Sequence, residues 1–536
     1  MADFADSGPS EPVRGAERSL ADVTAMEALQ APPSPVRPDW MVTRWPVSRE
    51  EFNSLNEQAN EASPPAAAPE EGPQEDEETP AEAVLDVEMP EDAEPVAPEA
   101  AAPPTTAAFD GIGQTAFTPP DNTIAVGPND VLAAVNTDLA GYTKLGAQRF
   151  RWANMTTLFN PVLPAQAGIF DPRVAYDHYA QRWIVVIAAR RQNPRGSWIM
   201  LAVSQGRDPA GAYWVWALDS SLDGSNPTAN WSDYPMLGFD ARGIYLGLSQ
   251  FAFAGGFQYT KVRILNKAEV YAGGVGSNHF IRWYDIWGLR NPDNSLAFTV
   301  QPATHFRGAG GNPPVYLVNA LWPSGTSLTL WTLSDALGFW SGRAPALAAA
   351  SVSCRGYDLP PDAVQPDTAT RVETNDSRLL NAMYQFVGGV QRLWTCHTSR
   401  HTWPGDSEAR SILQWYEIDV PSRMVTQQNG FGAARRYYYF PAVHTDFSRN
   451  AYLVFSRSGA DEYAQLRQTG RRTGDAAGSL QGSALVAAGD GAYTGGRWGD
   501  YFGICRDGSD SRVVWMYGER AARSNSWATR IAAARF

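Results

Sequence analysis

Cysteine and long apolar runs are the scarcest features of this chain. Its 536 residues contain three cysteines, Cys354, Cys396 and Cys505, and none belongs to a Cys-x-x-Cys pair. An odd number of isolated cysteines predicts neither a disulfide framework nor a thiolate metal site. The sequence also has no run of 18 apolar residues, so we expect no membrane-spanning helix.

The N-terminus lacks the pattern of a conventional secretory signal. No basic region followed by an apolar stretch opens the chain. Three interpretations stay open: an intracellular protein, export by another route, or a chain numbered without its leader.

Lysine is scarce too, and charge is unevenly placed. Three of the 43 basic side chains are lysines. Residues 1–108 carry 24 acidic and 5 basic side chains, so the formal net charge of −14 arises there. Residues 109–536 carry 33 acidic and 38 basic side chains. This mildly basic body has no basic stripe, and we therefore expect no nucleic-acid binding.

Residues 1–63 form a polar arm with short helical patches. Ser48 and Glu51 match a capping box and predict that a helix begins between them. Large apolar side chains just before this helix are candidates for docking another protein: Trp40, Met41 and Trp45. The alternative is that this segment packs on its own domain.

Residues 64–108 read as an acidic linker. They are rich in proline, alanine and glutamate, with ten prolines between residues 64 and 106. Such a stretch buries too little apolar surface to offset the entropy lost on ordering. We therefore predict a disordered, extended linker that holds the arm away from the body.

A short phrase recurs seven times in the body, residues 109–536. It consists of a proline or polar residue, four residues that include apolar side chains, a turn residue and a second apolar run. The phrases start at Asn122, Pro172, Pro235, Pro314, Asp376, Pro441 and Phe502. Their turn residues are Gly127, Asp177, Asp240, Asn319, Asn381, Asp446 and Asp507. Repetition at roughly this spacing is typical of propellers and other repeat architectures.

Each unit has room for about four strands, which predicts an all-β fold: one seven-bladed β-propeller of four-stranded antiparallel blades. The last unit is short, with 35 residues from Phe502 onward. Residues 109–121 can supply its missing strand, so we expect the N- and C-terminal strands of the body to share a blade. Two stacked β-sandwiches are the alternative. The Ala-rich segment 335–352 is a candidate helical or irregular insertion.

The body resembles a group of large, mostly uncharacterised bacterial propeller proteins. The strings that carry this resemblance are PPDNTIAVGPNDVLAAVN, FDPRVAYDHYAQRWIVV, SDYPMLGFDARGIYLGLSQF, RLWTCHT and RWGDYFGICRDGSD. The last string lacks the Asp-Pro expected after its strand. Members of the group are often exported and are sialidase-like in overall shape. The resemblance covers residues 109–536, implies an extracellular or cell-surface location, and implies no agreed activity.

Four carboxylates precede inner strands and should gather at one mouth of the channel. They are Asp121, Asp171, Asp233 and Asp500. Carboxylate oxygens suit Ca²⁺ or Mg²⁺, so these residues are a possible Ca²⁺ site. The alternative is that each aspartate caps its own turn. The turn aspartates of the repeats favour tight turns and predict a structural role.

Aromatic residues flank two of these carboxylates: Trp231, Tyr234, Trp498 and Tyr501. A flat apolar face beside a hydrogen-bonding acid is what a sugar-binding site requires, which makes these residues ligand-binding candidates. The alternative is blade-to-blade packing.

The sequence favours a binding protein over an enzyme. We predict a non-catalytic scaffold that presents a rigid propeller face to a protein or glycan partner and is tethered through its arm, as part of a surface or particle assembly. The alternative is a sialidase-like glycan hydrolase at the channel mouth. Such an enzyme needs three clustered arginines, a tyrosine nucleophile and an acid, and no phrase ties such a set together.

Overall fold

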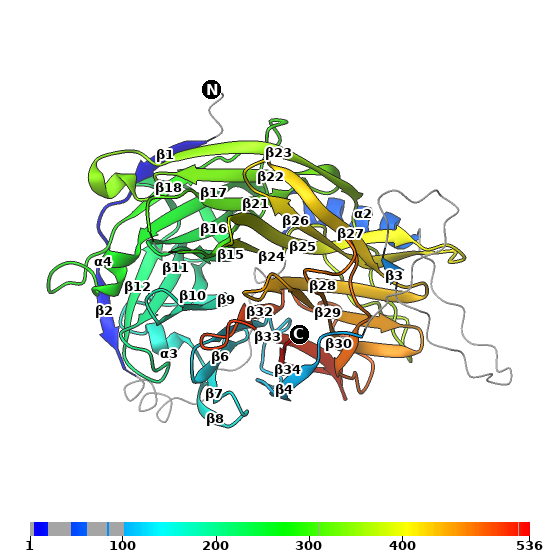
Figure 1. The fold of residues 1–536 in the computed structure, drawn as a ribbon. Helices are drawn as coiled ribbons and strands as arrows, with labels where there is room; N and C mark the ends of the chain where they lie inside the picture. Colours follow the sequence, from blue (N-terminus) through cyan, green and yellow to red (C-terminus); the bar gives the residue numbers. More distant parts are fainter. Residues whose placement is uncertain (1–4, 20–43, 62–82, 85–100, 309, 524) are drawn as a thin grey trace.

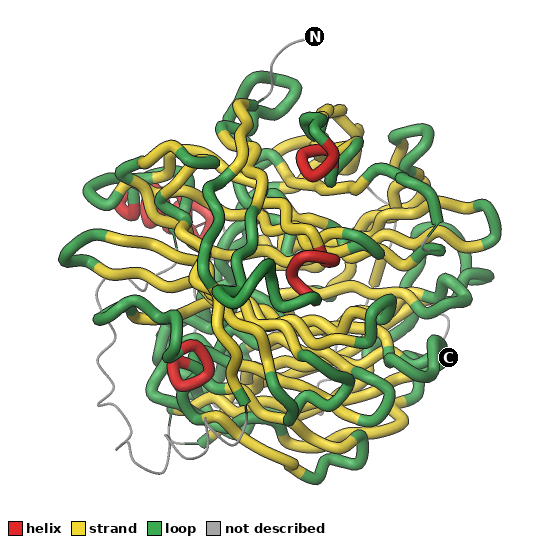
Figure 2. Tube along the Cα trace, turned by 90° about the vertical axis from the view of Figure 1, so that its left-hand side faces the viewer, coloured by secondary structure: helices red, strands yellow, loops and turns green. Residues whose placement is uncertain are grey.

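The structure, a computed structural model, describes residues 5–19, 44–61, 83–84, 101–308, 310–523 and 525–536. Within them the chain forms a seven-bladed β-propeller, as the repeated phrase predicts. In Figure 1 the colours pass round the molecule from cyan through green and yellow to red, where the last strand lies beside the first blade. Figure 2 shows that strands dominate and helices are few and short.

Blades 1 to 3 each start with an inner strand and add antiparallel strands outwards. Blade 1 contains β5 (Thr123–Val126), β6 (Asp130–Ala134), β7 (Leu139–Thr143) and β8 (Gln148–Trp152). Blade 2 contains β9 (Gly168–Asp177), β10 (Arg182–Arg191), β11 (Gly196–Ser204) and β12 (Tyr213–Asp219). Blade 3 contains β15 (Asn230–Phe239), β16 (Gly243–Ala252), β17 (Phe257–Asn266) and β18 (Trp283–Trp287). The connections hold α3 (Thr156–Phe159), β13 (Leu222–Asp223), β14 (Asn226–Pro227) and α4 (Lys267–Tyr271).

Blades 4 to 6 follow the same plan. Blade 4 contains β19 (Gln301–Pro302), β21 (Val315–Ala320), β22 (Gly325–Ser334) and β23 (Ala346–Tyr357), with the 3-10 helix η1 (Gly338–Ser341) before β23. Blade 5 contains β24 (Asn381–Val387), β25 (Val390–Thr402), β26 (Ala409–Asp419) and β27 (Met424–Gly432). Blade 6 contains β28 (Arg436–Thr445), β29 (Ala451–Gly459), β30 (Glu462–Arg471) and β31 (Ala484–Ala487). The short β20 (Thr304–Phe306) continues from β19 and pairs in parallel with β24, which links blades 4 and 5.

Blade 7 joins the two ends of the propeller. It contains β32 (Gly503–Arg506), β33 (Val514–Ala522), β34 (Ser526–Ala534) and β4 (Thr105–Asp110). β4 pairs with the C-terminal β34 in antiparallel register. The predicted closure is confirmed, and the closing strand begins at Thr105, four residues before the expected start of the body. Closure removes the open sheet edges that promote aggregation.

Two of the seven phrases occupy a different place from the one predicted. The phrase that starts at Pro314 forms β21, the second strand of blade 4, because β19 pairs with it on the inner side. The predicted turn residue Asn381 instead begins β24, and the hairpin turn falls at Gly388. The number of blades is unaffected, since each phrase still belongs to a separate sheet.

The described parts of the arm lie against the propeller. β1 (Asp6–Pro9) pairs with β18 and β2 (Gly15–Arg18) pairs with β12, so each adds a fifth strand to a blade. β3 (Ala83–Val84) pairs with β27. The prediction of disorder for residues 64–108 otherwise falls mainly outside the described residues. The expectation that the arm is held away from the body does not fit its described segments, which pair with the propeller. The outer strand of a blade has unpaired backbone groups, and these segments of the arm form hydrogen bonds with them.

The arm also contains a helix, which lies between β2 and β3 in the sequence. α2 (Arg49–Glu61) begins where the capping box predicts, since the Oγ of Ser48 accepts a hydrogen bond from the amide of Glu51 at 3.1 Å. No helix of the described residues is long and apolar enough to cross a membrane.

The hydrophobic core consists of clusters between successive blades. Ten tryptophans are among the largest fully buried side chains. Because a tryptophan buries about 150–250 Å², these residues account for much of the contact between blades. Close packing also extends to the inner strands: a Cβ atom on Gly238 of blade 3 would lie 2.5 Å from the carbonyl oxygen of Pro302 in blade 4.

Candidate functional site

One residue just before or early in most inner strands adopts a left-handed conformation. This position has φ between 50° and 62° in six blades: Asp121, Asp171, Tyr234, Thr299, Asn375 and Phe440. Three of these positions coincide with register shifts in the strand ladder. A bulge with a left-handed residue re-aims the local side chains, and Asp and Asn tolerate this conformation best. The repeat therefore turns the same position of successive blades toward one mouth.

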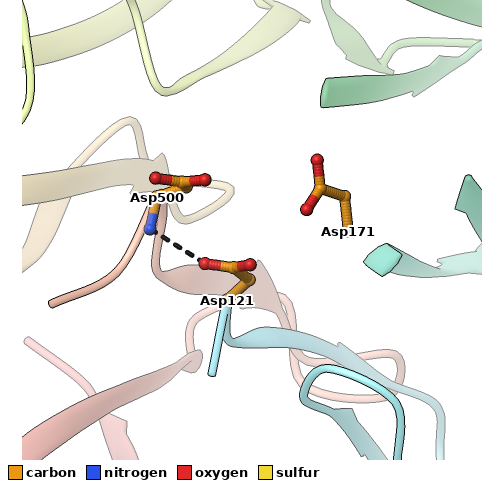
Figure 3. A group of neighbouring side chains, drawn as sticks. All are labelled: Asp121, Asp171 and Asp500. Carbon is orange, nitrogen blue, oxygen red and sulfur yellow. Dashed lines mark hydrogen bonds between the residues drawn. The ribbon is translucent and has the colours of Figure 1, made fainter. Parts of the chain in front are cut away.

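Three of the predicted aspartates meet at this mouth. Oxygen atoms of Asp121, Asp171 and Asp500 lie within 4.8 Å of one another, and all three side chains are buried. Figure 3 shows them arriving from three different blades, with the amide of Asp500 bonded to the Oδ1 of Asp121 at 3.0 Å. Sequence reasoning thus identified side chains that do converge.

Hydrogen bonds from amide groups connect the carboxylates. The side-chain amide of Asn136 donates to Asp121, and its Oδ1 accepts a hydrogen bond from the amide of Asp171 at 2.8 Å. The Oδ2 of Asp171 accepts from the amide of Tyr234 at 3.2 Å. Asn136 lies in the connection between β6 and β7, where no sequence motif marks it. Blades 7, 1, 2 and 3 are thereby bonded in succession around the mouth.

The fourth aspartate, Asp233, lines the same small cavity. This cavity measures about 30 Å³, and Arg44, Arg378 and Arg497 also line it. The guanidinium of Arg497 binds both oxygens of Asp500, at 2.9 and 3.0 Å. Since water occupies about 30 Å³ in the liquid, the space holds about one water or one ion.

Burial makes Asp121, Asp171 and Asp233 hard to ionise. It raises the pKa of Asp121 to about 8, with the charge of Asp500 as the next cause. Burial, then Asp233 and Asp121, raise the pKa of Asp171 well above its usual range. Burial raises the pKa of Asp233 to about 6, although Arg44 opposes the shift. The side chains can hold a cation through their oxygens, or they can share protons across the cluster. The first state is the Ca²⁺ hypothesis and the second needs no ion.

The four flanking aromatic residues are buried, with at most 3% of each exposed. The hydroxyl of Tyr234 donates to the carbonyl of Asp500 at 2.8 Å, and that of Tyr501 donates to the carbonyl of Pro172 at 2.8 Å. Arg190 covers Trp231, with its Cζ 4.0 Å from the ring centroid. Trp498 donates to the Oγ of Ser456 at 2.9 Å. These rings join blades and offer no free face to a sugar in this arrangement.

The described part of the arm packs beside this mouth, called the closed mouth from here on, and Arg44 lines its cavity. Trp45 is 6% exposed, and its indole donates to the Oδ1 of Asn375 at 3.0 Å. Its ring stacks on Phe52 of α2 with centroids 3.8 Å apart, and Leu359 completes the cluster. Trp45 therefore packs on its own domain. The other two docking candidates, Trp40 and Met41, lie outside the described residues.

The turn aspartates at the opposite mouth have structural bonds. Each carboxylate accepts a backbone hydrogen bond from two to four residues further on, as in the 2.7 Å bond from the amide of Ser509 to Asp507. This agrees with the predicted role in tight turns. The sequence did not reveal their ion pairs: Lys267 with Asp177, Arg307 with Asp240, and Lys144 with Asp507.

The central channel contains a second, larger cavity that sequence reasoning missed. It has a volume of about 280 Å³ and is lined by the inner strands of all seven blades. The exposed residues Ser509 and Ser511 lie on its rim, so it opens at the turn end of the strands. Two arginines line it, Arg173 and Arg506, and each lies inside a repeated phrase. A cationic residue within an otherwise apolar inner strand was the signal that could have indicated this cavity.

Comparison with known proteins finds distant similarity to solved structures alone. No family model and no curated protein matches it. A solved protein of unknown function from Dyadobacter fermentans DSM 18053 is similar at 10% identity with a TM-score of 0.37, over 70% of this chain and 97% of that one.

Two glycan-active proteins are also similar. A Trypanosoma rangeli sialidase in complex with sialic acid has 9% identity and a TM-score of 0.36, over 81% of this chain and 59% of the sialidase. The GH93 alpha-L-arabinofuranosidase of Fusarium graminearum has 8% identity and a TM-score of 0.29, over 66% of this chain and 89% of that one. The expected similarity to uncharacterised bacterial and sialidase-like propellers is found, and at these identities it concerns the fold alone.

Proposed function

We propose that this protein is a non-catalytic binding scaffold that takes its ligand at the open mouth of the central channel. The observation that carries the proposal is the contrast between the two mouths. At one, carboxylates, arginines and the arm leave room for about one water. At the other, a cavity of about 280 Å³ opens between the blades, close to the lower end of the range for small-molecule sites.

The side chains in the channel support binding over catalysis. Among its described lining residues, Asp507 is the one carboxylate. Its oxygens accept hydrogen bonds from Lys144 at 2.7 Å and from the indole of Trp515 at 2.8 Å. Although burial opposes it, the bond from Lys144 lowers the pKa of Asp507. An ionised, fully bonded carboxylate is a poor general acid, and most glycosidases require a pair of carboxyl groups.

The closed mouth argues against the alternative, a sialidase-like hydrolase at the carboxylates. A sugar ring does not fit a cavity with room for about one water. The arm would have to leave before any glycan reached Asp233 or Asp500. We propose instead that the arm stays bound at the closed mouth and that the protein or glycan partner binds the opposite face.

The biological setting belongs to the same proposal. We propose a division into an arm at residues 1–63, a linker that ends before β4, and a propeller that begins with β4 at Thr105. We also keep a bacterial, extracellular or cell-surface setting, in which the protein belongs to a surface or particle assembly. The open face, rather than Trp45, would then carry the contact with the partner.

A channel-filling variant tests the proposal. Ala382 lines the cavity and is 7% exposed, so Ala382→Trp should fill the channel. Ala344 is exposed, and Ala344→Trp is the matched control. A thermal-shift screen with glycans, sugar acids and organic acids should find compounds that stabilise the native protein and the control but not Ala382→Trp.

The same samples test for catalysis. Mass spectrometry should show every bound compound unmodified after incubation. Turnover of a glycan by the native protein would refute the non-catalytic part of the proposal. Stabilisation that survives in Ala382→Trp would refute the channel as the binding site.

A further inference from the structure

We infer that the channel binds a small carboxylate with an apolar body, and that Arg506 receives its anionic group. This inference rests on the proposed function, because it names the ligand class of the same cavity. It follows from three observations: an arginine without an acidic partner, an aromatic support that holds it at the rim, and apolar walls below it.

Arg506 is the charged group best placed to meet a ligand. Its Nε and Nη2 both donate to the carbonyl oxygen of Thr445, at 3.1 and 2.9 Å. Within the described part of the chain, Arg506 forms no ion pair, and no bond of its Nη1 is found. Burial lowers the pKa of Arg506 to about 10, although Asp446 partly offsets this effect. The side chain therefore stays charged at neutral pH, and among the described residues no carboxylate forms an ion pair with it.

An aromatic group holds this arginine in place. The Cζ of Arg506 lies 4.3 Å from the ring centroid of Phe306, a cation–π contact. His178 stacks on Phe306 with centroids 4.5 Å apart, and His444 packs edge-on at 5.0 Å. All four side chains line the cavity. The arginine is thus pre-positioned, which lowers the entropic cost of binding an anion.

The two histidines are neutral at pH 7, so neither supplies a second positive charge for the anion. Burial lowers the pKa of His178 to about 4 and that of His444 to about 3. The Nδ1 of His178 is buried without a hydrogen-bond partner among the described residues. Arg506 therefore carries the positive charge of this cluster.

Apolar side chains form much of the rest of the channel wall, beside polar ones such as Gln301 and Asn381. Aliphatic and aromatic side chains from five blades line it: Ile124, Val174, Met236, Leu237, Leu380, Ala382, Phe502 and Ile504. The deeper arginine, Arg173, is stacked on Tyr501, with its Cζ 3.2 Å from the ring centroid, and donates to the carbonyl of Pro235 at 3.0 Å. The volume of about 280 Å³ equals that of roughly nine waters. A ligand with about ten non-hydrogen atoms, such as benzoate or hexanoate, matches this space.

Calorimetry with the full-length protein tests the inference. The probes are benzoate, hexanoate, benzyl alcohol, glucuronate and inorganic phosphate. Benzoate and hexanoate should bind the native protein. Benzyl alcohol, glucuronate and phosphate should bind at least about tenfold more weakly. The reason is that a hydrogen bond to a charged group, or an apolar contact, contributes about one order of magnitude or more to the affinity. Phosphate or glucuronate binding as tightly as benzoate would overturn the apolar part of the inference.

Substitutions then locate the anionic group. Arg506→Gln should weaken benzoate binding about 10–100-fold, while Arg506→Lys keeps the charge and should retain most of it. Arg512, exposed and paired with Asp510 at 2.9 Å, lies outside the cavity lining, so Arg512→Gln is the matched control and should bind like the native protein. If Arg506→Gln does not fold, Phe306→Leu serves instead, because it removes the support of Arg506 and should weaken benzoate binding.

The outcomes separate this inference from the proposed function. Neutral probes that bind, are blocked by Ala382→Trp and ignore Arg506→Gln would refute the anion site and leave the binding scaffold standing. Benzoate binding that Ala382→Trp does not affect would refute both. Equal benzoate affinity in Arg506→Gln and native protein would also overturn the inference.

Discussion

The carboxylates at the closed mouth predict that ionisation of Asp121 destabilises the fold. Burial, then Asp500, raise the pKa of Asp121 to about 8 in the folded protein, whereas in the unfolded chain this group titrates near ~4. Between these values the folded protein holds a proton that the unfolded chain has lost. The stabilising contribution is therefore complete below pH ~4 and is lost as the pH rises toward 8.

The size of this effect follows from linkage. One proton held only by the folded state lowers the free energy of unfolding by about 1.4 kcal/mol per pH unit, or about 4 kcal/mol from pH 5 to pH 8. Buried histidines with lowered pKa values, such as His305 at about 3, change stability in the opposite sense below pH ~6.5. A comparison of two proteins at each pH removes their contribution.

The substitution Asp121→Asn supplies this comparison, because asparagine cannot ionise. Urea unfolding of both proteins is followed by tryptophan fluorescence in EDTA between pH 5 and pH 8. Relative to the native protein, the variant should gain about 1.4 kcal/mol per pH unit. A constant cost of the new amide, which faces the donors Asn136 and the Asp500 amide, shifts the curve without changing its slope.

A control and a metal titration sharpen the result. Asp335 is partly exposed and its pKa is lowered to about 2 by Arg343, so Asp335→Asn should show no slope in this range. A flat difference between Asp121→Asn and native protein would refute the reasoning, since it means that Asp121 is ionised in the folded state. The Ca²⁺ hypothesis predicts that millimolar Ca²⁺ stabilises the native protein at pH 8 and not Asp121→Asn, and the absence of that effect would refute it.

Two further substitutions test the arm and the blade contacts. Trp45→Ala removes a buried ring and its bond to Asn375, which costs about 3–5 kcal/mol of stability. Trypsin should therefore cleave the arm about 100-fold faster or more while the propeller stays folded. Unchanged cleavage would contradict the docked arm. Gly238→Ala places a Cβ atom 2.5 Å from the carbonyl oxygen of Pro302 and should lower stability by about 1–3 kcal/mol. Gly256 has open space around it, so Gly256→Ala should leave stability unchanged. Equal melting temperatures for the two variants would contradict the close contact of blades 3 and 4.

The repeat explains why the fold could be predicted from the sequence. Each phrase marks one sheet, and the short C-terminal unit predicts the shared blade 7. The phase of blade 4 could not be predicted, because β19 contributes only a two-residue ladder around Gln301 and Pro302, while the stronger apolar pattern after Pro314 belongs to the second strand. The segment 335–352, expected as a helical or irregular insertion, contains the 3-10 helix η1 in its first half, whereas from Ala346 it forms β23. In this second half, pairing with β22 overrides local preference.

The candidate site could be predicted only in part. The aspartates before the inner strands share a phase of the repeat, so their convergence could be predicted. The arm's position on the propeller depends on pairing with β12 and β18, which no local pattern encodes. The open cavity depends on the space left between seven strands, and single residues such as Arg506 acquire meaning only from neighbours such as Phe306, 200 positions away in the sequence.

The most direct test of the ligand-binding channel is a crystal structure of the protein with 4-bromobenzoate. We predict an anomalous bromine peak inside the cavity between the inner strands, with the carboxylate within hydrogen-bond distance of Arg506 at the open mouth. A channel without bound ligand at saturating concentration, or a peak only on the outer surface of the blades, would contradict it.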